Sequence, residues 1–294
     1  MRKASIIFIV FLLSSSQKIF GQIDNIVSDN DLENFIIQEF NYSSFYLFKK
    51  DSADNSQYWF KGDFNHDGIN DIFVYGIGES KARKQNLTYP ELFFIIGGKK
   101  LNIVDIPIWY FKNIFNYSLI NLKMIEYENR NYISLDYRKF HGKELIEANT
   151  DTIFIQYDEL MKFSKNPSYN EISSIDFKTT TCYGSCPVFE LHINSKRNAI
   201  YNGIKYVNKI GEQRMIADQT DWNYIESILK NMRVQELDSS YWVNWTDSQT
   251  GYLIVNFEDG SKKRIEDYGL QGNLGLYFLF NFLFKLANFN NNLD

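Results

Sequence analysis

One short segment of the chain alternates oxygen-bearing side chains around a glycine, a spacing that suits a hard cation. The candidate ligands are the side chains of Asp63, Asn65, Asp67 and Asp71 and the backbone carbonyl of Ile69. Calcium takes about six to eight oxygen ligands, which carboxylates and carbonyls provide. Gly68 lies where the loop must reverse sharply, and a residue without a Cβ does so at little cost. The segment is predicted to bind calcium in a structural role, and the alternative is a polar turn that binds no ion.

The flanks of this loop distinguish it from the helix-loop-helix calcium hand. The last ligand position of such a hand would be Val74, which cannot provide a bidentate carboxylate, and the flanks are predicted strands. The segment from Trp59 to Gly76 instead resembles the strand-loop-strand calcium element of FG-GAP and VCBS-type repeats. That resemblance implies the same ligand set. Because only one copy occurs in the sequence, a multi-bladed propeller is not predicted.

The two cysteines, Cys182 and Cys186, lie on either side of a glycine turn. In an oxidising compartment a lone nearby pair is more often a disulfide than two free thiols. A thiol oxidoreductase is one alternative, but its usual motif has a shorter spacer that opens a helix, whereas Pro187 leads into a predicted strand. A metal site is another, although His192 is the only nearby histidine. We therefore predict a structural disulfide.

Three acidic residues near the end of the chain are the remaining candidates for chemistry. Asp247, Glu266 and Asp267 could meet in space as an acid pair, but such residues are mostly solvated charges on hairpins, and that interpretation is favoured. The sequence contains no nucleophile elbow, phosphate loop or paired-histidine metal motif.

The N-terminal segment has the three parts of an export signal. A basic tip is followed by an apolar run, Ala4–Leu13, and then by small polar residues. The apolar run is about half the length of roughly 20 residues that a membrane-spanning helix needs. We predict a cleaved signal peptide, residues 1–21, and a periplasmic or secreted mature protein. Cleavage after Ser16 and an uncleaved anchor are the alternatives.

The composition favours a folded, β-rich protein and argues against a nucleic-acid partner. Aromatic residues make up 17% of the chain, and their side chains pack well on pleated sheets. The net charge is only −5, and no run of Lys or Arg forms a basic footprint. The chain exceeds the usual size of a single domain, so two domains are expected.

The hydrophobic pattern predicts an α+β protein of two antiparallel-sheet modules. In the first, residues 22–168, a helix over residues 31–40 precedes several short strands rich in Ile, Val, Phe and Tyr. The polar stretch Lys165–Asn170 is the predicted linker. The second module, residues 169–294, is predicted to follow the order β-β-β-α-β-β-α, with both helices on one face of the sheet.

The helices of the second module are predicted at residues 221–232 and 274–289. The second of these is apolar except for one polar stripe, formed by Asn281, Lys285 and Asn288. A membrane-spanning helix is usually longer and rarely carries such a stripe. A core helix is therefore predicted, so that no membrane span remains after signal cleavage, and membrane insertion is the alternative.

The cysteine motif Thr181-Cys182-Tyr183-Gly184-Ser185-Cys186-Pro187 and the late strand end Glu266-Asp267-Tyr268 together resemble the DUF6438 domain. The resemblance covers nearly all of residues 170–289. It implies an exported bacterial domain, and the family supplies no catalytic residues to transfer to this chain.

The combined features predict a calcium-stabilised, non-catalytic binding module of the cell envelope, whose partner is an envelope or extracellular protein or a glycan. The alternative is a secreted enzyme, either a hydrolase that uses carboxylates or a thiol oxidoreductase at the cysteine pair.

Overall fold

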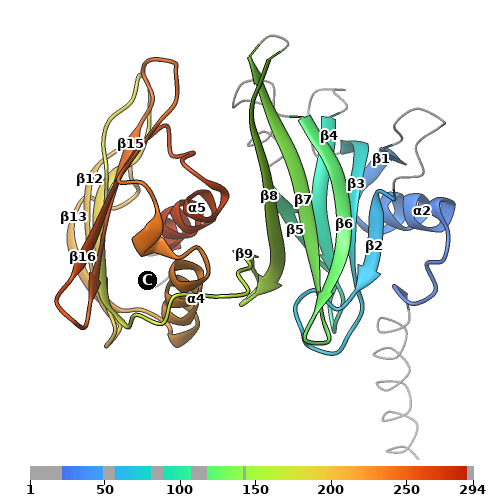
Figure 1. Ribbon diagram of the computed structural model, residues 1–294, viewed down its shortest axis with the longest axis horizontal. Helices are drawn as coiled ribbons and strands as arrows, with labels where there is room; N and C mark the ends of the chain where they lie inside the picture. The colour runs from blue at the N-terminus through green and yellow to red at the C-terminus, as the bar shows by residue number, and fades with distance from the viewer. Residues whose placement is uncertain (1–21, 49–56, 81–88, 107–117, 142–143, 290–294) are drawn as a thin grey trace, which may run out of the picture. The chain divides into compact units, whose positions relative to one another are not determined.

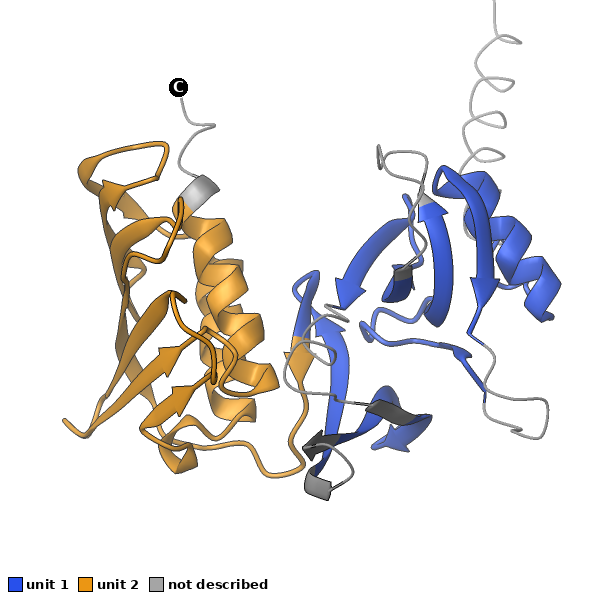
Figure 2. Cartoon of the chain, turned by 90° about the horizontal axis from the view of Figure 1, so that it is seen from above, with its two compact units in different colours: residues 1–160 blue, residues 161–294 orange. Residues whose placement is uncertain are grey.

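The computed structural model describes most of the chain in five segments, residues 22–48, 57–80, 89–106, 118–141 and 144–289. The predicted signal peptide, residues 1–21, lies outside the described residues. The chain divides into two compact units, Met1–Leu160 and Met161–Asp294 (Figure 2). The stretch Lys165–Asn170, where the sequence predicts the linker, lies at the start of the second unit.

The first unit begins with helix α2 (Asp29–Glu39), which packs on a five-stranded sheet. The strands are β1 (Tyr42–Leu47), β2 (Trp59–Gly62), β3 (Asp71–Ser80), β4 (Tyr89–Ile96) and β5 (Asn102–Ile106). They lie in the order β1-β3-β4-β5, and β2 also pairs with β3. The helix buries Leu32 and Ile36 completely, in one hydrophobic cluster with Phe45 and Phe93 of the sheet.

Helix α2 starts two residues before the predicted residue 31 because of its cap. The Ser28 hydroxyl accepts the backbone N–H of Asp31 at 3.2 Å, and the Asp31 carboxylate accepts the backbone N–H of Ser28 at 3.0 Å. This reciprocal capping box satisfies two backbone donors that a helix start leaves open. The cap residue is therefore Ser28.

A second sheet of the first unit is a four-stranded arrangement in the order β6-β7-β8-β9. Its strands are β6 (Ser118–Tyr127), β7 (Arg130–His141), β8 (Glu144–Gln156) and β9 (Glu159–Lys162). Strands β6 and β7 form a hairpin whose two turn residues, Glu128 and Asn129, both have positive φ. That conformation fits the turn whose twist matches the flanking strands.

The second unit is built on a seven-stranded sheet in the order β13-β12-β11-β10-β15-β16-β14. Its strands are β10 (Ile172–Thr179), β11 (Val188–Asn194), β12 (Asn198–Lys205), β13 (Gly211–Ile216), β14 (Ser240–Trp242), β15 (Thr250–Phe257) and β16 (Lys262–Tyr268). Its helices are α4 (Gln219–Asn231), the short 3-10 helix η1 (Val234–Glu236) and α5 (Leu274–Phe289). Neighbouring strands are antiparallel except β14 and β16, which run parallel.

Side chains of this sheet alternate between a face covered by helices and an outer face. On the covered face, the ring of Phe177 stacks on Phe280 of α5 at 5.0 Å, and Tyr224 of α4 contacts Phe282 at 4.3 Å. Figure 1 shows α4 and α5 on the same side of the sheet. The outer face carries mainly polar and charged side chains, as a strand buried on one face requires.

The strand order of the second unit is longer than the predicted β-β-β-α-β-β-α. Strand β13 was missed because its residues, Gly211 to Ile216, are mostly polar at the exposed edge of the sheet. Strand β14 was missed because it has only three residues. Helix α5 has the predicted bounds, and its Asn281 and Lys285 are exposed as the polar stripe requires. No helix in the described segments is both long and apolar enough to cross a membrane.

Candidate functional site

The loop between β2 and β3 folds around its own carboxylates. Asp63 accepts the backbone N–H groups of Asp67 at 3.1 Å and of Gly68 at 2.8 Å, and Asp67 accepts that of Ile69 at 2.8 Å. The Asn65 side-chain oxygen also accepts the Asp67 N–H at 3.1 Å, while its amide nitrogen donates to the Asp67 carboxylate at 3.0 Å. One oxygen of Asp63 and one of Asn65 therefore converge on the same nitrogen atom.

The carboxylate of Asp71 has a different role, because it is completely buried and binds backbone groups on both sides. One oxygen accepts the N–H groups of Phe64 at 2.9 Å and Asn65 at 3.2 Å, and the other accepts that of Gly97 at 2.8 Å. Burial raises the pKa of Asp71 to about 7, although these N–H donors favour the charged form. Asp71 ties the start of the loop to the turn after β4.

The β6–β7 hairpin and β8 support the same loop from the neighbouring sheet. The Asn131 side chain accepts the backbone N–H of Asp63 at 3.2 Å, and Nε2 of His66 lies 3.3 Å from the Asn131 carbonyl oxygen. The His66 ring stacks on Phe154 of β8 at 5.4 Å. Burial lowers the pKa of His66, which favours the neutral ring in this packing role.

The predicted calcium ligands are only partly brought together. Asp63, Asn65 and Asp67 meet within the loop, whereas Asp71 uses both its oxygens on backbone N–H groups. In the described part of the chain, no group of three or more His, Cys, Asp or Glu side chains is arranged to hold a metal ion. Calcium binding at this loop stays a prediction.

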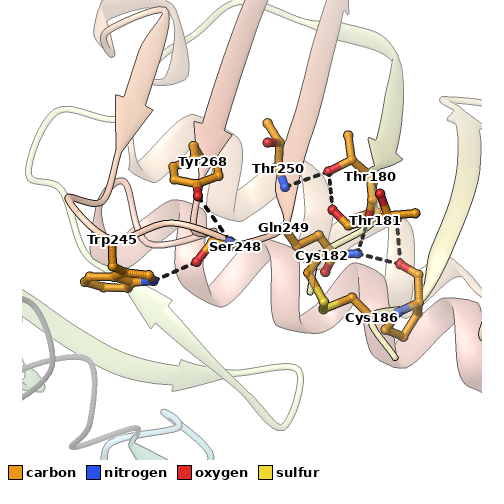
Figure 3. The surroundings of a disulfide bond; sticks show 11 residues. Thr180, Thr181, Cys182, Cys186, Trp245, Ser248, Gln249, Thr250 and Tyr268 are labelled. Carbon is orange, nitrogen blue, oxygen red and sulfur yellow. Dashed lines mark hydrogen bonds between the residues drawn. A yellow bond between two sulfur atoms is a disulfide. The ribbon is translucent and has the colours of Figure 1, made fainter. Parts of the chain in front are cut away.

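The two cysteines of the second unit form a disulfide, as their spacing predicts (Figure 3). The Cα atoms of Cys182 and Cys186 are 5.8 Å apart, within the usual range for such a bond. Gly184, between them, has a φ of 145° and donates its N–H to the Cys182 carbonyl at 3.0 Å. The bond closes a small loop at the end of β10.

The side chain of Gln249 holds both ends of this loop. Its amide nitrogen donates to the carbonyl of Thr180 at 2.8 Å and to that of Pro187 at 2.6 Å. The Thr180 hydroxyl in turn accepts the backbone N–H of Thr250 at 2.9 Å. Gln249 is 8% exposed, so these bonds are shielded from water and the β14–β15 loop is joined firmly to the disulfide loop.

Asp267 is not the solvated hairpin charge that the sequence suggested. It is 1% exposed, because alternation along β16 turns it towards the helices, and it accepts the N–H groups of Gln271 at 3.1 Å and Gly272 at 2.8 Å. Burial raises the pKa of Asp267 to about 6. Asp247, by contrast, is exposed and accepts the Thr246 hydroxyl at 3.0 Å.

Four aromatic residues lie at this end of the sheet, and they were not predicted from the sequence to form a binding surface. We call Tyr183, Trp242, Tyr252 and Tyr268 the aromatic surface. Tyr183 on the disulfide loop is 88% exposed, Trp242 on β14 is 76% exposed and Tyr252 on β15 is 38% exposed. Trp242 lies opposite Tyr268 in the β14–β16 pair. The strand alternation that buries Leu253 was the sequence signal that could have indicated the exposure of Tyr252.

The disulfide loop, the β14–β15 loop and the end of β16, which carry or adjoin the aromatic surface, are connected to one another. The backbone N–H of Tyr183 donates to the Asp247 carbonyl at 3.0 Å, and the Tyr268 hydroxyl accepts the backbone N–H of Ser248 at 3.1 Å. The indole N–H of Trp245 donates to the Ser248 hydroxyl at 2.6 Å (Figure 3). The exposed rings therefore stand on a framework whose backbone is held in place.

His192 lies further along the outer face, in a polar network rather than with the cysteines. Its Nδ1 is 2.7 Å from the Asp176 carboxylate, to which Asn256 donates at 3.0 Å. The Asn256 amide also donates to the Ser174 hydroxyl at 3.0 Å. The network joins β11, β10 and β15.

The second unit is a two-layer α+β domain, with one sheet covered on one face by helices. Residues 173–287 match the model of a family described as a domain of unknown function, DUF6438. The match confirms the resemblance that the cysteine motif and the late strand indicated for this part of the chain. No curated protein and no solved structure matches the chain.

Proposed function

We propose that this protein is exported and acts as a non-catalytic binding module of the cell envelope, with the aromatic surface of its second unit as the binding site. The observation that carries the proposal is the exposure of two rings on a backbone that is held in place. Tyr183, 88% exposed, lies on the loop closed by the disulfide and by Gln249, and Trp242, 76% exposed, lies on β14, which pairs with β16. Tyr and Trp are enriched at binding sites because each offers a large apolar face together with a hydrogen-bonding group.

Three of the groups that could perform chemistry at this end of the sheet, the two cysteines and Asp267, already have structural partners. Cys182 and Cys186 are bonded to each other, and both oxygens of Asp267 accept backbone N–H groups away from solvent. A hydrolytic carboxylate must reach its substrate or a water molecule, and a nucleophilic cysteine must be a thiolate. These observations favour binding over the alternative of a secreted hydrolase or thiol oxidoreductase.

The chemistry of the aromatic surface fits an extracellular protein or a glycan. Exposed rings pack against the apolar faces of such ligands, and the hydroxyl of Tyr252 and the carboxylate of Glu266, 3.4 Å apart, offer polar contacts beside them. Because the strands and the disulfide loop that carry these rings are held in place, little backbone conformational entropy would be lost on binding.

The test is a comparison of single variants of the mature protein on immobilised envelope proteins and envelope glycans. Trp242→Ala and Tyr183→Ala should lose material that the wild type retains. Tyr169→Ala should retain it, because Tyr169 is 86% exposed but lies outside the aromatic surface. Equal retention by all three variants, or no retention by the wild type, would remove the support for this site.

A thiol titration of the native protein separates the binding module from the redox enzyme. The disulfide predicts no reactive thiol before a reductant is added. Two free cysteines, one of them with a low pKa, would instead indicate an oxidoreductase.

We also propose that the loop at residues 63–71 binds Ca²⁺ and thereby stabilises the first unit. Its support is the convergence of Asp63, Asn65 and Asp67, whose oxygens are already positioned by the loop backbone. Asp71 accepts three N–H groups, and a carboxylate has about four acceptor sites, so one site is left for the ion. With the Ile69 carbonyl these groups are the predicted ligands, and the ion would offset the mutual repulsion of the carboxylates.

A further inference from the structure

Strand β13 forms an edge of the seven-stranded sheet. The side chains on its outer face would complement those of a second, antiparallel copy of the same strand. Along this face run Glu212, Arg214 and Ile216, and Ile210 directly precedes the strand. When the same series runs in the opposite direction, Arg214 takes the place of Glu212, and Ile216 takes the place of Ile210. The side chains of Ile210 and Ile216 are 67% and 65% exposed, so an apolar side chain flanks the charged pair on each side.

The same outer-face residues direct their backbone groups to the open edge. The backbone N–H of Ala217 donates to the Arg197 carbonyl at 2.9 Å, so the groups of Ala217 face β12. Backbone groups of an antiparallel strand alternate in direction from one residue to the next. Those of Glu212, Arg214 and Ile216 therefore point away from β12 and can pair with another strand.

Only one register of two antiparallel β13 strands joins opposite charges. A pairing centred on Gln213 sets Glu212 of each copy opposite Arg214 of the other, and it sets Ile210 opposite Ile216. A pairing centred on Glu212 would place the two Glu212 side chains directly opposite each other. A pairing centred on Arg214 would place the two Arg214 side chains directly opposite each other. Opposite charges on facing strands stabilise a sheet, and like charges destabilise it.

The side chains of Glu212 and Arg214 can leave their ion pair within one chain and pair with those of a second copy. Within one chain, Arg214 Nε lies 2.9 Å from the Glu212 carboxylate, but the two side chains are 75% and 55% exposed. An exposed ion pair of this kind contributes little to stability, so replacing it with a pair across two strands costs little.

We infer that two copies of this chain associate through β13, in the register centred on Gln213. The strand pair has a two-fold axis, and it continues the sheet of one copy into the other. A two-fold interface needs a self-complementary surface, which is what the outer-face residues of β13 provide. A single pair of short strands buries less than the area of about 1,600 Å² typical of stable complexes, so the dimer forms at micromolar concentrations rather than lower ones.

The experiment is sedimentation equilibrium of the mature protein over a range of micromolar concentrations. The wild type is expected to pass from monomer to dimer. Arg214→Glu and Glu212→Arg each place like charges opposite each other on both sides of the two-fold axis, so each should raise the dissociation constant at least about tenfold.

Two further samples separate a lost interface from a misfolded protein. The double variant Glu212→Arg/Arg214→Glu restores opposite charges and should dimerise like the wild type. An equimolar mixture of the two single variants should form a heterodimer, because each supplies the charges that the other lacks. These rescues cannot occur if either substitution unfolds the chain.

Arg264→Glu is the matched control, since it reverses an exposed arginine on the outer face of the same sheet but on β16. It should leave the dissociation constant unchanged. A wild type that stays monomeric throughout, a double variant without rescue, or equal weakening by Arg264→Glu would each overturn the inference.

Discussion

The carboxylate of Asp267 accepts the backbone N–H of Gly272 at 2.8 Å, and this contact leaves no space for a side chain at residue 272. A Cβ added to Gly272 would lie 2.8 Å from the Asp267 oxygen and 2.5 Å from Cγ of Tyr241. The buried carboxylate thus holds the turn that leads from the last strand into α5, the helix that packs against the sheet.

Gly272→Ala should destabilise the second unit, because the new methyl group must displace the Tyr241 ring or break the hydrogen bond to Asp267. We expect the free energy of unfolding to fall by about 2 kcal/mol or more, measured by urea denaturation. Gln271→Ala is the control. It keeps the backbone N–H that Asp267 accepts, and its Oε1 is buried with no hydrogen-bond partner among the described residues, so its removal should cost little. Equal effects of both substitutions would contradict this account of the turn.

The buried Asp267 should make the protein less stable as the pH rises from acid towards neutral. Its pKa is raised to about 6, whereas an aspartate in an unfolded chain titrates near about 3.9. Between these values the folded state holds more protons than the unfolded state. The contribution of this group to the free energy of unfolding therefore falls by up to about 3 kcal/mol across that window and is constant above it.

The measurement is the free energy of unfolding of the wild type minus that of Asp267→Asn, at several pH values between 4 and 7. Asp71, whose pKa is raised to about 7, adds a similar slope, but it is present in both proteins and cancels in the difference. A difference that does not change with pH would show that Asp267 does not titrate as its burial predicts.

The disulfide should stabilise the second unit modestly, because it closes a short loop. The bonded residues are four apart in sequence, and in the chain-entropy model such a loop contributes about 2 kcal/mol. The variant Cys182→Ser/Cys186→Ser should lose about that amount in urea denaturation. It should match the wild type measured with a reductant, and a reductant should leave the variant unchanged.

Calcium should raise the melting temperature of the mature protein, and a chelator should reverse the increase. A cation bound only by the folded state, present at about 100 times its Kd, adds about 2.7 kcal/mol of stability. Asp67→Ala removes a central ligand and should abolish the increase. Asp24→Ala should retain it, because Asp24 accepts the Asn70 side-chain amide at 2.8 Å beside the loop and is not among the ligands. Identical transitions with calcium and with chelator would contradict the proposed site.

Features that depend on neighbouring residues could be predicted from the sequence. The pairing of Cys182 with Cys186 follows from their spacing around a glycine, since a short turn brings the two Cα atoms within reach. The bounds of α5, Leu274–Phe289, follow from the length of its apolar run. The cysteine motif together with the late strand end, Glu266-Asp267-Tyr268, indicated the family whose model matches residues 173–287.

The burial of single polar groups could not be predicted, because it depends on residues far apart in the chain. Asp71 accepts the backbone N–H of Gly97, in the turn after β4. Gln249 donates to the backbone carbonyls of Thr180 and Pro187. Nothing in the local sequence around these residues distinguishes them from solvated loop residues.

Three local elements of this protein, namely the disulfide loop, the strand alternation and the last helix, follow from the sequence because contacts between near neighbours decide them. Other features depend on how the strands and helices pack, namely which carboxylates are buried, which aromatic rings are exposed and which strand forms an edge. The cause is that strand order is set by packing between distant segments. Asp267 and Glu266 are adjacent in the sequence, yet one holds the turn before α5 and the other faces solvent beside Tyr252.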